Sequence, residues 1–309
     1  MKIAHISDLH FGKSREQNEN IKTLIGRIQA FGVDHLAITG DLTACGSVEQ
    51  YKGIISILDK NNFFSAERLT VIPGNHDLFN YILRYFHSAT DILKRMHRLP
   101  AAIYNSLKFN IEKYQKELQQ FYFYFQETFF NSIKPNQQAE LFPFAKELFE
   151  DTVLITIDSN AAIGLKKNNA ASNGRVHLGS LETLLQDARI RDKKKIVMMH
   201  HYLQSEKNMI KDHGRGYSRF MKLKNRKETT QLLIDNDIDL VLHGHHHENV
   251  EYWINGDMLR VLNGGGSYYG PCWNLVDITA EDTKIEVMDA VRLQKQGLCP
   301  DHKKLRKRK

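Results

Sequence analysis

Polar side chains able to bind a metal or move a proton follow an apolar run at residues 73–77, Pro-Gly-Asn-His-Asp. The run before them, Leu-Thr-Val-Ile at 69–72, is typical of a buried strand, and Pro-Gly predicts that it ends in a tight turn. Asn75, His76 and Asp77 offer an amide oxygen, an imidazole and a carboxylate. Taken alone, such a group is more typical of a turn whose Asn and Asp bond their own backbone, so its interpretation depends on the rest of the chain.

Four other polar groups each follow an apolar run in the same way. They are Asp8 with His10, Asp41, His200, and His245 with His247. Carboxylates, imidazoles and amide oxygens are ligands for borderline divalent metals such as manganese, iron or zinc. One group alone would fit a helix cap or a buried histidine. Five groups at the ends of predicted strands are expected to meet in one crevice, so the sequence predicts a metal site there.

The elements that position these groups alternate along the chain. Residues 3–6, 36–39 and 69–72 are predicted strands, and residues 17–31 and 47–58 between them have helical periodicity, with Ser47 as the expected N-cap. Such alternation predicts an α/β fold with a largely parallel sheet, whose ligands gather beyond the carboxyl ends of the strands. Further strands are predicted at 152–157, 196–199 and 240–242. Residues 250–254, 259–262 and 274–288 alternate like antiparallel strands of a second sheet.

The strand pattern is interrupted at residues 78–150, which are predicted to be a helical cap insertion rich in aromatic residues. The run Phe-Tyr-Phe-Tyr-Phe at 121–125 is aromatic on more than one helix face. The rings either pack in the core or expose an apolar cleft for substrate, with Phe121 and Phe125 as candidate contacts. The predicted domain therefore comprises residues 1–77 and 151–292, followed by a basic tail at 293–309.

Composition limits the class of protein. The chain has 309 residues, of which 41% are hydrophobic and 26% charged, which suits one large domain with an insertion. Neither a leader-like start nor an apolar run of roughly 20 residues is present, so a cytoplasmic protein is expected. The three cysteines form no CxxC pair, which indicates neither a disulfide framework nor a thiolate zinc site. The net charge is +7, and the basic tail is either a solvated end or a patch for the anionic inner face of a membrane.

The five groups, in order, resemble the signature of the calcineurin-like metallophosphoesterases. The matching motifs are Asp8-x-His10, Gly40-Asp41, Gly74-Asn75-His76-Asp77, His200 and Gly244-His245-x-His247. The resemblance covers everything except the insertion and the tail. It implies a four-layer αββα sandwich in which two mixed β-sheets pack face to face between helices, with the insertion after the third strand. It also implies two divalent metal ions, with manganese expected and iron or zinc as alternatives.

Carried over residue by residue, the resemblance implies a role for each polar group. Asp8, His10 and His247 would hold one ion, Asn75, His200 and His245 the other, and Asp41 would bridge them. A hydroxide between the ions would attack the phosphorus of an anionic ester, while His76 protonates the leaving group. Asp77 would be the second residue of the catalytic group, where it would either orient His76 or close the turn.

The neighbouring histidines are assigned by comparison with the same family. The family usually has His-x-Pro where this chain has His200-His201-Tyr202, so His200 is the expected ligand and His201 its support. His243 and His246 are interpreted as packing or surface residues.

The expected substrate is a phosphate ester, and three classes of protein compete. The first is a phosphodiesterase or pyrophosphatase. The stretch from Gly40 to Tyr51 is similar to the cyclic-nucleotide and glycerophosphodiester phosphodiesterases, a branch that resembles the UDP-2,3-diacylglucosamine hydrolases of lipid A synthesis. Those enzymes cut a pyrophosphate and bind acyl chains under an apolar helical cap. The aromatic insertion and a basic loop favour a phosphodiester or pyrophosphate of amphiphilic character, with a small cyclic nucleotide or glycerophosphodiester as the alternative. The basic residues expected to contact it are Arg215, Arg219, Lys222 and Lys224.

The two other classes are a nuclease and a binding scaffold without activity. The basic charge mildly favours a nuclease, but no DNA-contacting or dimerising region is evident beyond the insertion, so nucleic acid is not the expected partner. A scaffold is disfavoured because no ligand position is substituted. The sequence predicts no oligomeric state.

Overall fold

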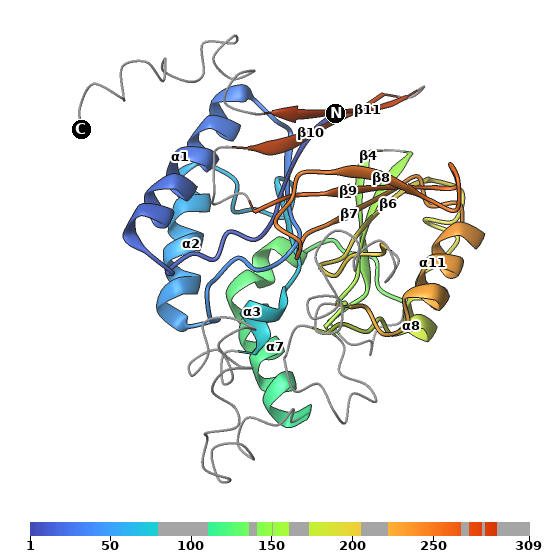
Figure 1. The fold of residues 1–309 in the computed structure, drawn as a ribbon, viewed down its shortest axis with the longest axis horizontal. Coiled ribbons are helices and arrows are strands. Elements are labelled where there is room, and N and C mark those ends of the chain that lie inside the picture. Colours follow the sequence, from blue (N-terminus) through green and yellow to red (C-terminus); the bar gives the residue numbers. More distant parts are fainter. Residues whose placement is uncertain are drawn as a thin grey trace.

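The computed structural model describes residues 1–79, 111–135, 141–149, 151–160, 173–204, 222–266, 272–279 and 282–288. Two mixed β-sheets form the centre of the molecule and helices cover their outer faces (Figure 1). One group of buried side chains combines residues of both sheets, for example Ile6 and Leu242, and a second lies between the second sheet and its helices. The α/β sandwich of two mixed sheets with flanking helices is therefore confirmed.

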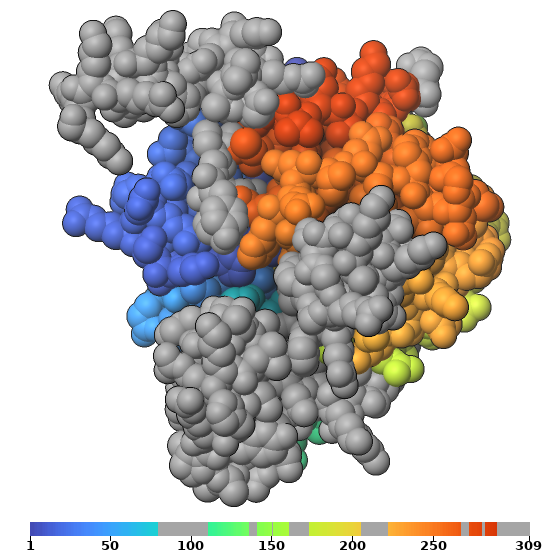
Figure 2. Space-filling view, in the orientation of Figure 1, coloured from blue at the N-terminus to red at the C-terminus, as the bar shows by residue number. Residues whose placement is uncertain are grey.

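The first sheet has the order β11-β10-β1-β2-β3. Its strands are β1 (Lys2–Ile6), β2 (His35–Ile38), β3 (Leu69–Val71), β10 (Trp273–Ile278) and β11 (Thr283–Met288). β1, β2 and β3 are parallel, whereas β10 pairs antiparallel with β1, so strands far apart in the sequence are neighbours in this sheet. Figure 2 shows the segment of β10 and β11, in red, at the surface. β2 and β3 are buried along their whole length, as expected for parallel strands covered on both faces.

The second sheet has the order β4-β5-β6-β7-β9-β8. Its strands are β4 (Phe144–Phe149), β5 (Thr152–Thr156), β6 (Lys194–Met198), β7 (Leu240–His243), β8 (Glu251–Ile254) and β9 (Leu259–Asn263). β5, β6, β7 and β9 are parallel, and the two edge strands are antiparallel to their neighbours.

Two predictions about the strands are corrected. β4 lies within the stretch that was expected to be helical, so the insertion contributes an edge strand to the second sheet. The strands after residue 250 do not form one sheet: β8 and β9 extend the second sheet, while β10 and β11 extend the first. The second error concerns which distant strand is the partner, and alternation along a strand carries no information about that partner.

The helices begin and end close to the predicted residues. Helix α1 (Arg15–Phe31) buries Ile21, Leu24, Ile25 and Ile28 on one face and ends at Gly32 in the left-handed conformation. Helix α2 (Val48–Lys60) begins after Ser47, whose side chain accepts a hydrogen bond from the backbone of Gln50, as predicted. Helices α8 (Leu178–Leu185) and α11 (Arg226–Asp235) pack on the outer face of the second sheet.

The described part of the insertion packs into the core. Helix α3 (Asn75–Leu78), which begins in the last polar group of the first sheet, leads into it. The insertion itself contains α7 (Ile111–Phe125) and the 3₁₀ helix η2 (Gln126–Phe129). Phe121 and Phe125 have no exposed surface, and their ring centroids lie 6.1 and 5.9 Å from that of Tyr51 on α2. Rings without exposed surface do not line a substrate cleft, so the prediction that these two contact substrate is wrong. Phe123 and Phe130 are 64% and 61% exposed.

Lys146 on β4 joins the insertion strand to the first sheet. Its ammonium group donates to the carbonyls of Ala66 and Leu69, at 3.0 and 2.7 Å. Burial lowers the pKa of Lys146 to about 7, because little water remains to solvate the charge. This contact crosses from one sheet to the other beside the start of β3.

In the described part of the chain, no helix combines the length and the apolar character needed to span a membrane. The basic tail at 293–309 lies outside the described residues, and its contact with a membrane stays a prediction. The same applies to Arg215 and Arg219.

Candidate metal centre

The predicted metal ligands lie in the loops that follow β1, β2, β3, β6 and β7. Backbone hydrogen bonds join these loops: the N–H of Asp8 donates to Gly40 at 3.1 Å, and that of His10 donates to Asp41 at 2.9 Å. Between the sheets, His200 donates from Nδ1 to the carbonyl of Thr39 at 2.8 Å. The two sheets therefore deliver their polar ends to one place.

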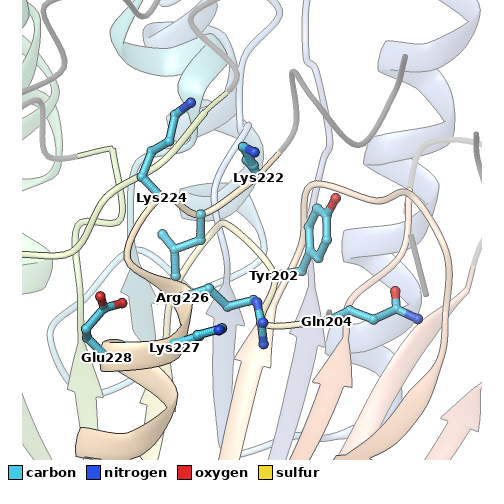
Figure 3. A pocket seen from close by; sticks show the side chains of 8 residues that line it. Tyr202, Gln204, Lys222, Lys224, Arg226, Lys227 and Glu228 are labelled. Carbon is cyan, nitrogen blue, oxygen red and sulfur yellow. The ribbon is translucent and has the colours of Figure 1, made fainter. Parts of the chain in front are cut away.

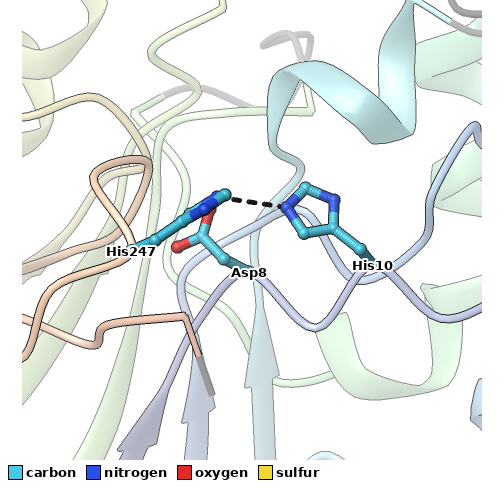
Figure 4. A group of neighbouring side chains, drawn as sticks. All are labelled: Asp8, His10 and His247. Carbon is cyan, nitrogen blue, oxygen red and sulfur yellow. Dashed lines mark hydrogen bonds and ion pairs between the residues drawn. The ribbon is translucent and has the colours of Figure 1, made fainter. Parts of the chain in front are cut away.

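The first group of ligand-like side chains is Asp8, His10 and His247 (Figure 4). His10 Nε2 lies 3.2 Å from His247 Nε2, and His247 Nε2 lies 3.4 Å from Asp8 Oδ1. Asp8 also accepts from the backbone N–H of His245, at 2.9 Å. That bond holds the carboxylate toward the histidine loop after β7.

The second group is Asp41, His200 and His245. His200 Nε2 lies 3.1 Å from His245 Nδ1 and 3.2 Å from the side-chain oxygen of Asn75. The side-chain oxygen of Asn75 therefore lies beside a histidine of the second group, and its role as a ligand stays a prediction.

Asp41 lies between the two groups. Its Oδ2 is 3.8 Å from His10 Nε2, and its Oδ1 is 3.5 Å from His200 Nε2. One carboxylate thus faces a histidine of each group with a different oxygen. This is the position that a bridging ligand requires.

The chemical state of these donors fits a pair of divalent cations. Burial lowers the pKa of His10, His200 and His245, so the imidazoles are neutral and present lone pairs. Burial and the charges of Asp8 and Asp77 raise the pKa of Asp41 well above its usual range. A cation between the groups would favour the ionised form of Asp41, and carboxylate, imidazole and amide oxygen are the donors that such cations use.

Backbone strain is concentrated in the same loops. Asp8, His10, Asp41, His245 and His247 all have positive φ angles, between 47° and 73°. Such angles are uncommon outside glycine, and they persist only where the surrounding structure enforces them. Gly40, at φ 93°, allows a further close approach, because a Cβ there would lie 2.6 Å from His200 Nδ1.

His76 lies beside the first group. Its Nδ1 donates to the carbonyl of Ala44 at 3.0 Å, and its Nε2 is 3.9 Å from Asp41 Oδ2. The side chain is 25% exposed, and burial lowers its pKa to about 4. His76 is also close enough to His10 and Asp41 for these three to form a metal-binding group.

Asp77 has no exposed surface and joins two loops. Its carboxylate accepts from the backbone of Gly74 at 2.9 Å and Leu42 at 3.2 Å, and from both the backbone and the hydroxyl of Thr43 at 3.0 and 2.7 Å. A fully buried carboxylate cannot contact substrate. The predicted catalytic role of Asp77 is therefore replaced by a positioning role, in agreement with the turn-closing alternative.

Ser159, after β5, supports the site, and the sequence interpretation missed it. Its hydroxyl accepts from the backbone N–H groups of His200 and His201, at 3.2 and 3.0 Å, and lies 2.8 Å from His201 Nδ1. The signal was present, because Asp-Ser-Asn at 158–160 follows a sixth apolar run. The contact with Ser159 fits the supporting role expected for His201, which stays a prediction.

The remaining histidines are packing residues. His243 is buried, and its Nε2 lies 2.9 Å from the hydroxyl of Tyr252. The ring of His246 packs edge-on against Tyr202, with centroids 4.1 Å apart. Neither residue belongs to the ligand-like groups among the described residues.

Potential metal ligands on both sides of Asp41, at the strand ends of a two-sheet sandwich, are consistent with a dinuclear metal site. The chain belongs to the family described as calcineurin-like phosphoesterase, whose model matches residues 1–249.

The chain is similar to proteins described as probable cyclic nucleotide phosphodiesterases. The identity is 37% over 82 residues with one from Vesicomyosocius okutanii and 34% over 82 residues with one from Ruthia magnifica. Each match covers 26% of this chain and only 34% and 33% of the relatives, respectively.

Solved structures share the fold at low identity. A dimetal phosphatase from Danio rerio has a TM-score of 0.57 at 10% identity, covering 93% of this chain and 95% of that one. A purple acid phosphatase from yellow lupin seeds has a TM-score of 0.54 at 13% identity, covering 94% of this chain and 51% of that one.

Proposed function

We propose that this protein is a phosphodiesterase that uses two divalent metal ions, with manganese as the expected metal. The observation that carries the proposal is the position of Asp41, whose two oxygens face a histidine of each ligand group at 3.8 and 3.5 Å. Two ions held there would lower the pKa of a shared water and stabilise charge on the phosphate oxygens. Hydrolysis would join the oxygen of water to phosphorus, break the bond to the leaving-group oxygen, and give that oxygen a proton.

His76 is the proton donor in this proposal. Because Nδ1 is held by the carbonyl of Ala44, the proton for the leaving group must be carried on Nε2, which faces Asp41. An anionic phosphate beside the ring would raise the pKa of His76 toward neutrality, which favours the imidazolium form.

A small soluble phosphodiester, the class that includes cyclic nucleotides, is the favoured substrate. The burial of Phe121 and Phe125 removes much of the reason to expect an acyl-binding cleft. The similarity to proteins named probable cyclic nucleotide phosphodiesterases favours the same class. An amphiphilic pyrophosphate such as UDP-2,3-diacylglucosamine is the second candidate, supported by the exposed rings of Phe123 and Phe130.

The proposal is tested with bis(p-nitrophenyl) phosphate, whose leaving group needs little protonation. We expect hydrolysis with manganese, loss of activity with a chelator, and recovery when manganese is restored. Faster hydrolysis of p-nitrophenyl phosphate than of the diester would replace the proposal with a phosphatase. A parallel comparison of cyclic nucleotides, glycerophosphodiesters and UDP-2,3-diacylglucosamine then ranks the substrate classes.

A further inference from the structure

A basic pocket of about 210 Å³ is lined by residues from the segment after β6 and from the segment that begins α11 (Figure 3). Four cationic side chains and one carboxylate contribute to its lining, together with an aromatic ring, an amide and an apolar side chain. These residues are Tyr202, Gln204, Lys222, Leu223, Lys224, Arg226, Lys227 and Glu228. The excess of positive charge around one cavity favours an anionic occupant.

The backbone that carries the cationic side chains is fixed in place. Lys222 and Lys224 flank Leu223, which forms a β-bridge with Gly174. The amide of Gly174 donates to the carbonyl of Lys222 at 3.0 Å, and the amide of Lys224 donates to the carbonyl of Gly174 at 2.8 Å. Asn225, which is buried, exchanges two side-chain hydrogen bonds with the backbone of Val176. The basic pocket is therefore held by the fold on one of its walls.

The same wall reaches the metal centre. A Cβ added to Gly174 would lie 2.5 Å from Cγ of His201, so the anchoring segment packs directly on the histidine next to His200. Tyr202 lines the pocket, and its ring centroid lies 6.1 Å from that of the predicted ligand His245. One aromatic side chain thus separates the pocket from the second group of metal ligands.

We infer that the basic pocket binds a second phosphate group of the substrate while the metal centre holds the phosphodiester that is cleaved. This inference rests on the proposed phosphodiesterase activity and defines its substrate class as a phosphodiester that carries an additional phosphate. A simple cyclic nucleotide has only the one phosphate that the metal centre would hold, so it would leave the pocket without a phosphate. Lysine and arginine side chains donate charge-assisted hydrogen bonds to phosphate oxygens, which are stronger than bonds between neutral groups.

Two chromogenic substrates that differ by one phosphate provide the test. They are thymidine 5′-(p-nitrophenyl phosphate) and the same compound with a 3′-phosphate, and both release p-nitrophenolate from a diester. We expect a higher kcat/KM for the 3′-phosphorylated substrate in the wild-type protein. In the double variant Lys224→Ala, Lys227→Ala, the ratio of the two kcat/KM values is expected to fall about tenfold, as the loss of contacts to a charged group predicts.

The matched control is the double variant Lys52→Ala, Lys60→Ala, which removes the same charge from exposed positions on α2. Its ratio should equal that of the wild type. Calorimetry with thymidine 3′,5′-bisphosphate and thymidine 5′-monophosphate gives a readout independent of turnover, and the preference for the bisphosphate should weaken in the Lys224, Lys227 variant.

The outcomes separate the two proposals. If neither substrate is hydrolysed with manganese, the proposed phosphodiesterase activity fails. If both are hydrolysed with a ratio that the pocket variant leaves unchanged, the activity stands and the second phosphate site is refuted. Equal losses of the ratio in the pocket and control variants would also refute it, because the effect would then come from net charge. If inorganic phosphate inhibits both substrates equally and the bisphosphate shows no preference, the pocket binds phosphate without selecting substrate, which overturns the inference.

Discussion

His76 contacts Asp41 in two ways. The backbone N–H of His76 donates to Asp41 Oδ1 at 2.8 Å, and the imidazole Nε2 lies 3.9 Å from Asp41 Oδ2. The first contact positions the carboxylate that we propose as the bridge and does not depend on the side chain of His76. The second places the proposed proton donor beside the expected position of the phosphate.

The two contacts predict different effects for two substitutions. Asp41→Ala removes the shared carboxylate and should abolish both metal binding and activity. His76→Ala keeps the backbone hydrogen bond and should retain two ions, while turnover of substrates with poor leaving groups falls by about 10²–10⁴-fold. Bis(p-nitrophenyl) phosphate should be affected less.

Elemental analysis together with kinetics checks these expectations. A His76→Ala protein with one ion missing would show that His76 is a ligand, as its proximity to His10 and Asp41 permits. Two retained ions and full activity in Asp41→Ala would falsify the dinuclear assignment.

Asp77→Asn is expected to weaken the site through its loops. The Asp77 carboxylate accepts hydrogen bonds from the backbone N–H groups of Gly74, Leu42 and Thr43. An asparagine would turn its own N–H₂ group toward some of these donors and leave them without an acceptor. Each buried donor left without an acceptor costs about 1–3 kcal/mol of unfolding free energy. Urea unfolding should show this loss, and activity should fall alike on all substrates. Asp59→Asn, at an exposed position on α2, is the control and should change neither quantity. Loss of activity at unchanged stability would instead assign Asp77 a direct catalytic role.

Because His35 is buried in its neutral form, we expect the protein to be less stable in mild acid than at neutral pH. Its Nδ1 donates to the carbonyl of Glu67 at 2.8 Å, so Nε2 accepts from the hydroxyl of Thr70 at 2.9 Å. Burial, and then the charge of nearby Lys146, lower the pKa of His35 to about 3. The unfolded chain binds a proton near pH 6.5 and the folded chain does not. The stability contribution is therefore complete above pH 6.5 and is lost as the pH falls toward 3.

The expected size of this effect is about 1.4 kcal/mol of unfolding free energy at pH 5.5 relative to pH 8. Unfolding free energies of the wild type and His35→Gln, measured from pH 8 to pH 5, test it. The difference between the two proteins should shrink as the pH falls. A difference that does not vary with pH would rule out titration of His35 as the cause.

Alanine substitutions of two phenylalanines on α7 are expected to change stability by different amounts. Phe125→Ala removes a fully buried ring and should cost about 3–5 kcal/mol, with activity on every substrate reduced alike. Phe123→Ala removes a ring that is 64% exposed and should change stability by less than about 0.5 kcal/mol. Melting temperatures and the ratio of activities on an acylated and a soluble diester distinguish the two. A selective loss of the acylated activity in Phe123→Ala would favour the amphiphilic substrate over the small one.

Much of the fold could be predicted because it depends on neighbouring residues. The helical periodicity of α1 and α2, the Ser47 cap and the apolar strands β1, β2 and β3 are all local patterns. β4 was missed because Phe144–Phe149 is an edge strand inside a stretch that was expected to be helical. The separation of β8 and β9 from β10 and β11 was missed because strand pairing depends on distant partners.

By itself, the sequence determined the donor types, their order, and the fact that each group follows an apolar strand. These features sufficed to place Asp8, Asp41 and His200 in one predicted crevice. Only the tertiary structure decided which oxygen of Asp41 faces which histidine, and that Asp77 binds loops instead of substrate. It also decided that Phe125 is core and that Lys224 lines a pocket beside the site. The physical reason is that residue type sets what a side chain can bind, whereas its direction and exposure depend on packing between segments far apart in the chain.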